Sequence, residues 1–285
     1  MDEATSEPIV PLMRRVPVHD VELAVTWFGE GRAGVPLVVV HGYTGAGRDW
    51  HKVVDRLATD RPVLTYDHRG HGASTWGPAG SYTRRRLGAD LVELLDAHGV
   101  QRAHVLGHSL GGLVALDLAL DHPDRVASLL AVDTAAATTD QIDLAATEQL
   151  ADHGRRDGMP AVVAEMIKGL DEAEGPPLLS PQAREAMIYT LGAVDPEVLT
   201  ALADELNHYD VMARLTGISC PTTVVVGSED HLRDAADRLA EGIAGAQLVV
   251  LDGVGHNPQL EARRRLRATI ADHLRWAEAE TADRG

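Results

Sequence analysis

Residues 105–112, which read VLGHSLGG, constrain the fold of this chain more than any other stretch. They run from a short apolar segment through Gly-x-Ser-x-Gly into a predicted helix over 110–122. A serine held on a sharp turn between a strand and a helix has strained backbone angles, and the residues two positions away on either side must be small. Gly107 and Gly111 stand at those two positions. The stretch therefore predicts a strand, a nucleophile elbow at Ser109 and a helix in direct succession.

Strand and helix patterns alternate on both sides of this elbow. The predicted strands are 13–19, 23–28, 36–40, 61–66, 104–107, 126–132, 221–226 and 247–251, and the predicted core helices are 49–58, 82–98, 110–122, 233–243 and 259–279. An uninterrupted apolar run such as 36–40 is typical of a strand covered on both faces. The first two strands, joined by the turn residues His19 and Asp20, are expected to form an antiparallel edge pair. The pattern predicts an α/β fold with a mostly parallel eight-stranded sheet and helices on both faces.

Between residues 134 and 214 the strand pattern is replaced by helices. Capping residues stand at or near prolines at three expected helix starts, which are Asp157 with Pro160, Ser180 with Pro181, and Asp195 with Pro196. An all-helical insertion into an α/β sheet is most simply a cap or lid. We therefore expect a flexible tail over 1–12, a core made of 13–133 and 215–285, and a helical cap over 134–214.

Charge and cysteine content limit the classes of partner. The 285 residues carry a formal net charge of −17, which disfavours nucleic acid and anionic membranes because both would be repelled. The single cysteine, Cys220, excludes an internal disulfide and is compatible with a reducing compartment. The acidic start lacks the pattern of a signal peptide, and no apolar run reaches the roughly 18 to 20 residues of a membrane span. We expect a cytoplasmic protein that acts on a small molecule, and the sequence leaves its oligomeric state open.

Three polar residues follow predicted strands in the chain order nucleophile, acid, histidine. Ser109 follows the strand 104–107, Asp230 follows 221–226 and His256 follows 247–251. Loops beyond the carboxyl ends of parallel strands converge on one crevice. A serine hydroxyl is a poor nucleophile at neutral pH, so it needs a base, and the base needs a group that orients it. The three loops could supply these parts.

With these motifs the chain resembles the α/β-hydrolase superfamily, in the serine esterase and lipase-like branch with a helical cap, from about residue 20 to residue 275. The resemblance rests on the elbow, the Asp230 loop and three further segments in family order, which are HG at 41–42, DHRGHGAS at 67–74 and GHNP at 255–258. It implies that Ser109 is the nucleophile, His256 the general base and Asp230 the acid that orients it. It also implies an oxyanion hole made by the backbone N–H groups of Tyr43 and Leu110. No metal or organic cofactor is implied.

Some assignments stay open at this point. Asp133, which follows the strand after the elbow, and Glu229, beside Asp230, are alternatives for the acid. Asp67 and Arg69 are expected to form a structural pair near the site. Five residues are candidates for lining a substrate pocket: His41, His108, Met159, Met166 and Met187.

The expected reaction is hydrolysis of a small to medium, largely apolar carboxylic ester, lactone or thioester through an acyl-enzyme. The low aromatic content of 4% favours an aliphatic pocket made adaptable by methionine. A carbon–carbon bond hydrolase, an acyltransferase or a cofactor-free haloperoxidase could use the same three residues. A ligand receptor that retains them and uses cap closure as a signal is a further alternative. The serine at the elbow argues against the dehalogenase and epoxide hydrolase branches, which the superfamily associates with an aspartate there.

Overall fold

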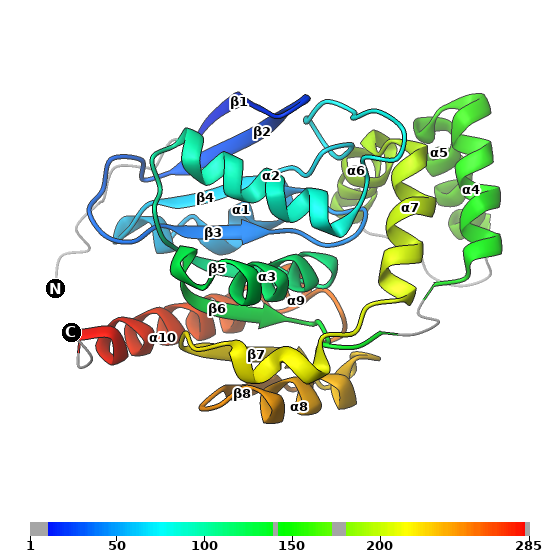
Figure 1. The fold of residues 1–285 in the computed structure, drawn as a ribbon. Coiled ribbons are helices and arrows are strands. Elements are labelled where there is room, and N and C mark those ends of the chain that lie inside the picture. The colour runs from blue at the N-terminus through cyan, green and yellow to red at the C-terminus, as the bar shows by residue number, and fades with distance from the viewer. Residues whose placement is uncertain (1–10, 139–141, 173–180, 283–285) are drawn as a thin grey trace, which may run out of the picture.

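A computed structural model describes residues 11–138, 142–172 and 181–282 of the chain. In this part of the chain eight strands form one sheet in the order β1-β2-β4-β3-β5-β6-β7-β8 (Figure 1). The strands are Leu12–Val18 (β1), Val21–Phe28 (β2), Leu37–Val40 (β3), Val63–Tyr66 (β4), Ala103–His108 (β5), Val126–Val132 (β6), Thr222–Gly227 (β7) and Gln247–Leu251 (β8). Strand β2 pairs antiparallel with β1 and β4, and the remaining pairs are parallel. The predicted fold class and the antiparallel edge pair are confirmed.

Helices cover both faces of this sheet. One face packs against α2 (Arg84–Ala97), α3 (Leu110–Asp121) and α8 (Arg233–Gly242), and the other against α1 (His51–Val54) and α10 (Arg263–Ala282). Successive side chains of a strand point to opposite faces, so Val38 and Val40 belong to the first core and Leu37 and Val39 to the second. This two-sided burial explains why the central strands read as uninterrupted apolar runs.

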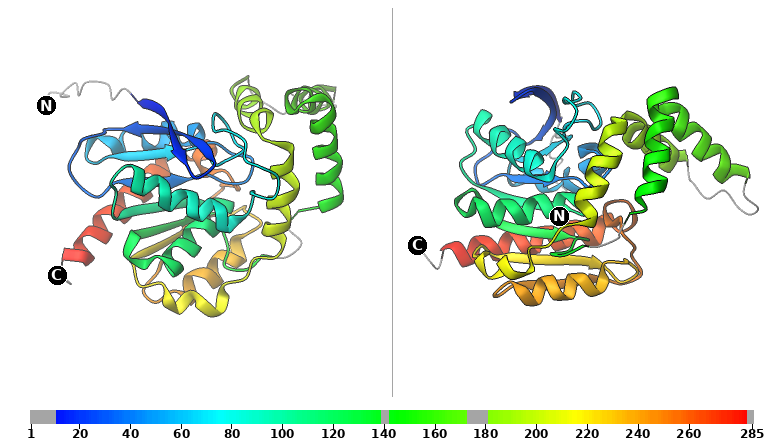
Figure 2. Two further views of the ribbon diagram at one scale, coloured as in Figure 1. Left: turned by 45° about the horizontal axis from the view of Figure 1, so that its top comes forward. Right: turned by 45° about the vertical axis from the view of Figure 1, so that its right-hand side comes forward.

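In the described residues between β6 and β7, four α-helices lie beyond one end of the strands, as two further views show (Figure 2). They are α4 (Leu144–Asp157), α5 (Met159–Glu172), α6 (Pro181–Thr190) and α7 (Pro196–Asn207). Asp195 caps α7 as expected, since its carboxylate accepts the backbone N–H of Glu197. The helix start expected at Asp157 with Pro160 is present as α5, which begins at Met159, but Asp157 does not cap it, because Asp157 ends α4 and Gly158, with φ 85°, separates the two helices. The expected capping residue Ser180 lies outside the described residues.

Two predicted helices are divided in the structure. The segment expected to be helical over 49–58 consists of a 3₁₀ turn at Gly47–Trp50, the short α1 and a second 3₁₀ turn at Leu57–Thr59. The last helix is split into α9 (Pro258–Glu261) and α10 at Ala262, whose φ of −134° and ψ of 36° are not helical. Alanine is the best helix former, so the local sequence does not signal this break. The buried packing of Ala262 in the second core accompanies it.

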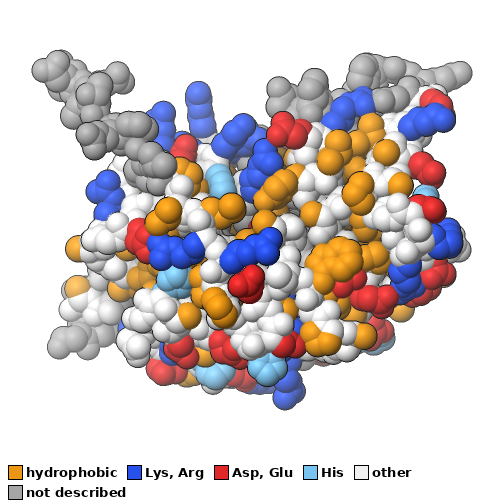
Figure 3. Space-filling view, turned by 90° about the horizontal axis from the view of Figure 1, so that it is seen from above, with side chains coloured by type: hydrophobic (Ala, Val, Ile, Leu, Met, Phe, Trp, Pro, Cys, Tyr) orange, Lys and Arg blue, Asp and Glu red, His pale blue; other side chains and the backbone are white. Residues whose placement is uncertain are grey.

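Charges of both signs are mixed on part of the surface. On the face seen in Figure 3, Lys and Arg side chains lie among Asp and Glu side chains, so the net charge of −17 is not concentrated there. Ion pairs such as Arg14–Glu30 and Arg48–Glu185 join exposed side chains of opposite sign. Within the described residues no single helix is long and apolar enough to cross a membrane. One pair, Arg184–Ala193 with Pro196–Asn207, passes by length and composition only when joined across a 90° bend.

Candidate active site

Ser109 lies at the turn between β5 and α3 with φ 52° and ψ −120°. A non-glycine residue in such a conformation costs about 1 to 3 kcal/mol, and such residues cluster at active sites. A Cβ atom at Gly107 would lie 2.3 Å from the carbonyl oxygen of Gly111, and one at Gly111 would lie 2.2 Å from that of Val40. Both positions therefore require glycine. The crowding that the five-residue pattern implies is present.

Three side chains from three strand ends form a hydrogen-bonded chain at this turn. His256 Nε2 lies 3.1 Å from Ser109 Oγ, and His256 Nδ1 lies 2.9 Å from Asp230 Oδ2. When Nδ1–H donates to the carboxylate, Nε2 is the nitrogen free to accept the serine proton. The Asp230 side chain is fully buried, whereas 27% of the His256 side chain is exposed. This arrangement can activate a hydroxyl for attack on a carbonyl group.

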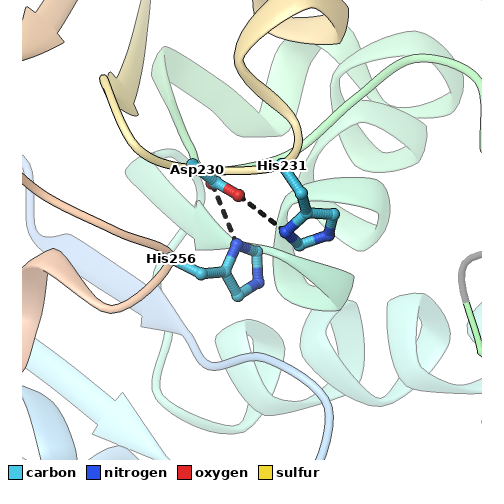
Figure 4. A group of neighbouring side chains, drawn as sticks. All are labelled: Asp230, His231 and His256. Carbon is cyan, nitrogen blue, oxygen red and sulfur yellow. Dashed lines mark hydrogen bonds and ion pairs between the residues drawn. The ribbon is translucent and has the colours of Figure 1, made fainter.

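The carboxyl group of Asp230 is held from several sides. Its Oδ1 accepts the backbone N–H of Leu232 at 3.1 Å and faces His231 Nδ1 at 2.9 Å, so the two histidines bracket one carboxylate (Figure 4). Burial acts to raise the pKa of Asp230, but hydrogen bonds from His256 and Asp133 outweigh it and hold the pKa well below its usual value. Asp230 is therefore a carboxylate at neutral pH.

The two alternative acids occupy different places. Asp133 is fully buried with φ 43°, and its Oδ1 accepts the backbone N–H of Gly227 at 2.9 Å. Burial and a hydrogen bond with Asp230 raise the pKa of Asp133 far above its usual value, so Asp133 is neutral and donates its proton to Asp230. Glu229 is exposed and accepts a hydrogen bond from Ser228 Oγ. Of the three acids, Asp230 is the one that contacts His256.

The expected oxyanion donors belong to two backbone segments beside Ser109. A Cβ atom at Gly42 would lie only 3.1 Å from Ser109 Cβ, so the loop that carries Tyr43 passes directly along the nucleophile. Leu110 opens α3, and the first N–H groups of a helix have no acceptor within the helix. Both segments can therefore present backbone N–H groups to negative charge that develops next to Ser109.

His41 and His108 are buried and hold the loops around the site. His41 Nδ1 donates to the Gly42 carbonyl at 2.8 Å, and its Nε2 accepts the backbone N–H of His68 at 2.9 Å. His108 Nε2 donates to the backbone carbonyl of His256 at 2.8 Å. Burial lowers the pKa of His41 well below its usual value and lowers the pKa of His108 to about 4. Both rings are thus neutral near pH 7, and their hydrogen bonds connect the loops around the site.

Two cavities adjoin these residues. The first, called here the serine cavity, has a volume of about 250 Å³ and is lined by Ser109, His256, Tyr43, Leu113, Thr134, Ala135, Thr138, Ile142, Leu206, His231 and Leu232. The second, called the α6 cavity, has a volume of about 330 Å³. It is lined by residues of the loop 41–50, of α6 and of 257–260, together with His108 and Leu191. Tyr43 borders both, and its hydroxyl donates to the Leu199 carbonyl of α7 at 2.6 Å. Space for a substrate therefore exists on two sides of Tyr43.

The three candidate methionines lie in different surroundings. Met187, on α6, lines the α6 cavity together with His41 and His108. Met159 is 3% exposed and packs within the helical insertion against Gly154, where a Cβ atom would meet its Sδ at 2.5 Å. Met166 is 38% exposed on α5 and lines neither cavity. Helical spacing identifies an apolar face but cannot say whether that face meets another helix, water or a cavity.

The expected pair between Asp67 and Arg69 does not form. The two oxygens of Asp67 accept backbone N–H groups of Gly47 and Ala73, each at 2.8 Å. Arg69 is buried and pairs with Asp90, with 2.6 Å between Nε and Oδ2, and with Asp20 at 3.0 Å. The prediction is wrong because the Asp67 carboxylate is taken up by backbone N–H groups, and the Arg69 guanidinium is taken up by two other carboxylates.

Sequence reasoning overlooked His231 and Gln259. His231 contacts Asp230 and borders the serine cavity, and its position directly after the acid was the available signal. Gln259 is 4% exposed and lines the α6 cavity. A glutamine two residues after the GHN segment carries no local signal of such burial.

Among the described residues one group could hold a metal ion, namely Asp230, His231 and His256, whose ligand atoms lie within 4.8 Å of one another. In the structure the Nδ1 atoms of both histidines already face the two oxygens of Asp230 (Figure 4). An ion bound by these atoms would break the contact that orients His256. The donor set is thus already engaged in the hydrogen-bonded chain.

Comparison with known proteins identifies the family of the chain. Residues 35–263 match the family model of the alpha/beta hydrolase fold. The protein named "Putative carbamate hydrolase RutD" of Caulobacter sp. (strain K31) is 30% identical over 243 residues, which cover 84% of this chain and 90% of that protein. The protein of the same name from Pseudomonas savastanoi pv. phaseolicola is 29% identical, with 85% and 95% covered.

Two solved structures are similar over nearly their whole length. The enol-lactonase from Burkholderia xenovorans LB400 superposes with a TM-score of 0.76 at 27% identity, covering 92% of this chain and 99% of that chain. A thermophilic esterase from Thermogutta terrifontis superposes with a TM-score of 0.77 at 27% identity, covering 93% and 99%.

Proposed function

Because the chain belongs to the alpha/beta hydrolase fold family and is a hydrolase, we propose that it cleaves small to medium, largely apolar carboxylic esters, lactones or thioesters through an acyl-enzyme on Ser109. The observation that carries this proposal is the continuous contact from Ser109 through His256 to Asp230 at the edge of the serine cavity. The aliphatic and small side chains that line this cavity suit an apolar acyl or alcohol group. Relatives named enol-lactonase and esterase support the same bond class.

In the proposed reaction Ser109 Oγ attacks the carbonyl carbon while His256 Nε2 takes the hydroxyl proton. The Asp230 carboxylate keeps the tautomer with its proton on Nδ1 and stabilises the imidazolium that forms. Backbone N–H groups of Tyr43 and Leu110 would stabilise the tetrahedral oxyanion, each contributing roughly 10²- to 10³-fold in rate. His256 then protonates the leaving alcohol or thiol, and water activated by the same histidine releases the acid.

The proposed nucleophile can be tested by covalent labelling. A fluorophosphonate probe should label the wild-type chain and Ser128→Ala, and it should not label Ser109→Ala. Ser128 is a matched control because it is a buried serine hydrogen-bonded to histidine outside both cavities. Undiminished labelling of Ser109→Ala, or labelling without turnover of short p-nitrophenyl esters, would contradict the proposed hydrolysis.

The proposed acid can be tested by isosteric amides at the two adjacent acidic positions. Asp230→Asn should lower kcat by about 10⁴-fold, because an amide favours the wrong tautomer of the histidine. Glu229→Gln should leave kcat within about twofold, since this exposed side chain contacts Ser228 rather than His256. Equal losses in the two variants would remove Asp230 from the proposed role.

A further inference from the structure

The α6 cavity has no part in the proposed proton transfers, although it adjoins the nucleophile. Gly42 and Tyr43 line it, and a Cβ atom at Gly42 would lie 3.1 Å from Ser109 Cβ. Gly42 and Tyr43 thus lie between Ser109 and this cavity, and Tyr43 borders the serine cavity as well. The two cavities differ in charge, because Asp49 lines the α6 cavity and no acidic residue is among those that line the serine cavity.

Gln259 supplies the clearest of these acceptors. Its side chain is 4% exposed, and its Nε2 donates to Asn257 Oδ1 at 3.2 Å. Its Oε1 is buried and has no hydrogen-bond partner among the described residues. Buried polar atoms in folded proteins are nearly always paired, and an exception indicates water or a ligand. Gln259 lines the α6 cavity, so an N–H or O–H donor of a ligand there is a candidate partner for this oxygen.

Asp49 adds negative charge to the same wall. Its Oδ2 accepts the backbone N–H of Ala46 at 3.0 Å, and the residue lines the cavity. Burial raises the pKa of Asp49 to about 6, so the group is ionised at pH 8. The charge of the nearby Arg48 acts to lower the pKa of Asp49, although its guanidinium pairs with Glu185 at 2.8 Å and stacks over the Tyr189 ring.

The histidines of the wall do not offset this charge. His41 and His108 are neutral near pH 7 because burial lowers the pKa of each. The His108 Nε2 donates to the His256 carbonyl, so its Nδ1 carries a lone pair. The polar part of the wall thus carries one negative charge beside the polar groups of Thr44, Thr190 and Asn257, while Trp50, Met187 and other apolar residues form the rest.

We propose that the α6 cavity is a substrate subsite for a group that carries N–H or O–H donors, an ammonium above all, while the apolar part of the substrate occupies the serine cavity. Gln259 Oε1 and the Asp49 carboxylate accept hydrogen bonds from this group, and the Asp49 charge favours a cation. This subsite rests on the proposed hydrolysis at Ser109. It narrows the substrate class to amphiphilic esters that have one polar, donor-bearing end.

The test compares matched esters at pH 8. One series varies the acyl group of p-nitrophenyl esters as hexanoate, 6-hydroxyhexanoate and 6-aminohexanoate. The other varies the alcohol of acetate esters as hexyl, 6-hydroxyhexyl and 6-aminohexyl. In at least one series the donor-bearing esters should have the higher kcat/KM, with the amine highest. Gln259→Leu should lower the ratio of donor-bearing to apolar kcat/KM about tenfold, the effect of losing one hydrogen bond to a charged donor.

Two further variants separate the contributions. Asp49→Asn retains an acceptor for Ala46 N–H, and it should lower the ratio for the amine more than the ratio for the alcohol. Gln247→Leu makes the same change as Gln259→Leu at an exposed position of β8 and should leave both ratios unchanged. Thermal unfolding checks that each variant is folded, and Asp49→Asn decides the question if Gln259→Leu does not fold.

The subsite is overturned if the apolar esters are preferred in both series, or if Gln259→Leu and Asp49→Asn leave both ratios unchanged while hydrolysis still depends on Ser109. Hydrolysis that persists in Ser109→Ala would instead overturn the proposed function itself. The two failures are therefore distinguishable within one set of measurements.

Discussion

Neighbouring strands of this sheet each carry a serine in contact with histidine, and the two contacts behave differently. Ser109, after β5, meets His256 at 3.1 Å. Ser128, within β6, meets His104 Nδ1 at 2.7 Å and His273 Nε2 at 2.8 Å. By distance alone Ser128 is the better-bonded serine. A short contact between serine and histidine therefore does not by itself identify a nucleophile.

The surroundings of the two serines account for the difference between their contacts with histidine. Ser128 is fully buried inside a strand, and His273 Nδ1 meets the hydroxyl of Thr223 at 2.7 Å, where His256 meets a carboxylate. Burial lowers the pKa of His273 to about 3, so this ring cannot hold a second proton near pH 7. Ser109 instead stands on a strained turn beside a cavity. A carboxylate partner and space for a substrate separate the proposed catalytic arrangement from the structural one.

The largest expected difference comes from removing each histidine. His256→Ala should lower kcat for p-nitrophenyl butyrate by about 10⁴- to 10⁶-fold, since the members of such a triad act as a unit. His273→Ala should keep kcat within about threefold and lower the free energy of unfolding by about 2 to 4 kcal/mol, because it leaves a cavity and unpaired hydroxyls. Steady-state kinetics and urea unfolding check both. A large loss of kcat in folded His273→Ala would break the distinction.

A smaller effect is expected from substitutions of Asp133, which lies beside the Asp230 carboxylate. Asp133→Asn keeps an acceptor for Gly227 N–H and an N–H donor for Asp230, so kcat should change less than about threefold. Asp133→Ala removes that donor and should lower kcat about 10- to 100-fold, the usual range for residues that orient a catalytic group.

A purely structural role for Asp133 makes a different prediction for the same variants. It would lower the melting temperature of Asp133→Ala without moving the pH dependence of kcat/KM. We expect the acidic limb of that profile to shift, because Asp230 would lose a hydrogen bond that stabilises its ionised form. An unchanged profile together with unchanged kcat would show that Asp133 does not position Asp230.

The smallest effect concerns how folding stability changes at acid pH through His104 and His273, the two histidines that contact Ser128. Burial lowers the pKa of His104 to about 4 and that of His273 to about 3, so between pH 6 and 5 the unfolded chain binds protons that the folded chain does not. Stability must then fall as the pH falls, by up to about 1.4 kcal/mol per pH unit for each histidine. The double variant His104→Gln/His273→Gln should reduce this slope, measured by urea unfolding at each pH. An unaltered slope would mean that these two groups do not titrate on unfolding.

Most of the fold was predictable because its signals are local. The elbow pattern follows from crowding between Gly107, Gly111 and the backbone of β3, and this crowding exists for any chain that makes the turn. Apolar runs and caps such as Asp195 likewise depend on a few neighbouring residues. The break at Ala262 and the division of the helix expected over 49–58 escaped prediction, because they arise from packing rather than from propensity.

The sequence by itself determined the α/β fold, its eight strands and the three loops that carry Ser109, Asp230 and His256, because strand order and loop position follow from patterns along the chain. Only the tertiary structure decided that Asp230 contacts His256, that Asp133 stands behind it, and that Gln259 is buried beside a cavity with an oxygen that has no partner among the described residues. Those outcomes depend on the direction of single side chains after a strand or turn. That direction is set by contacts with residues far away in the chain, which no local pattern records.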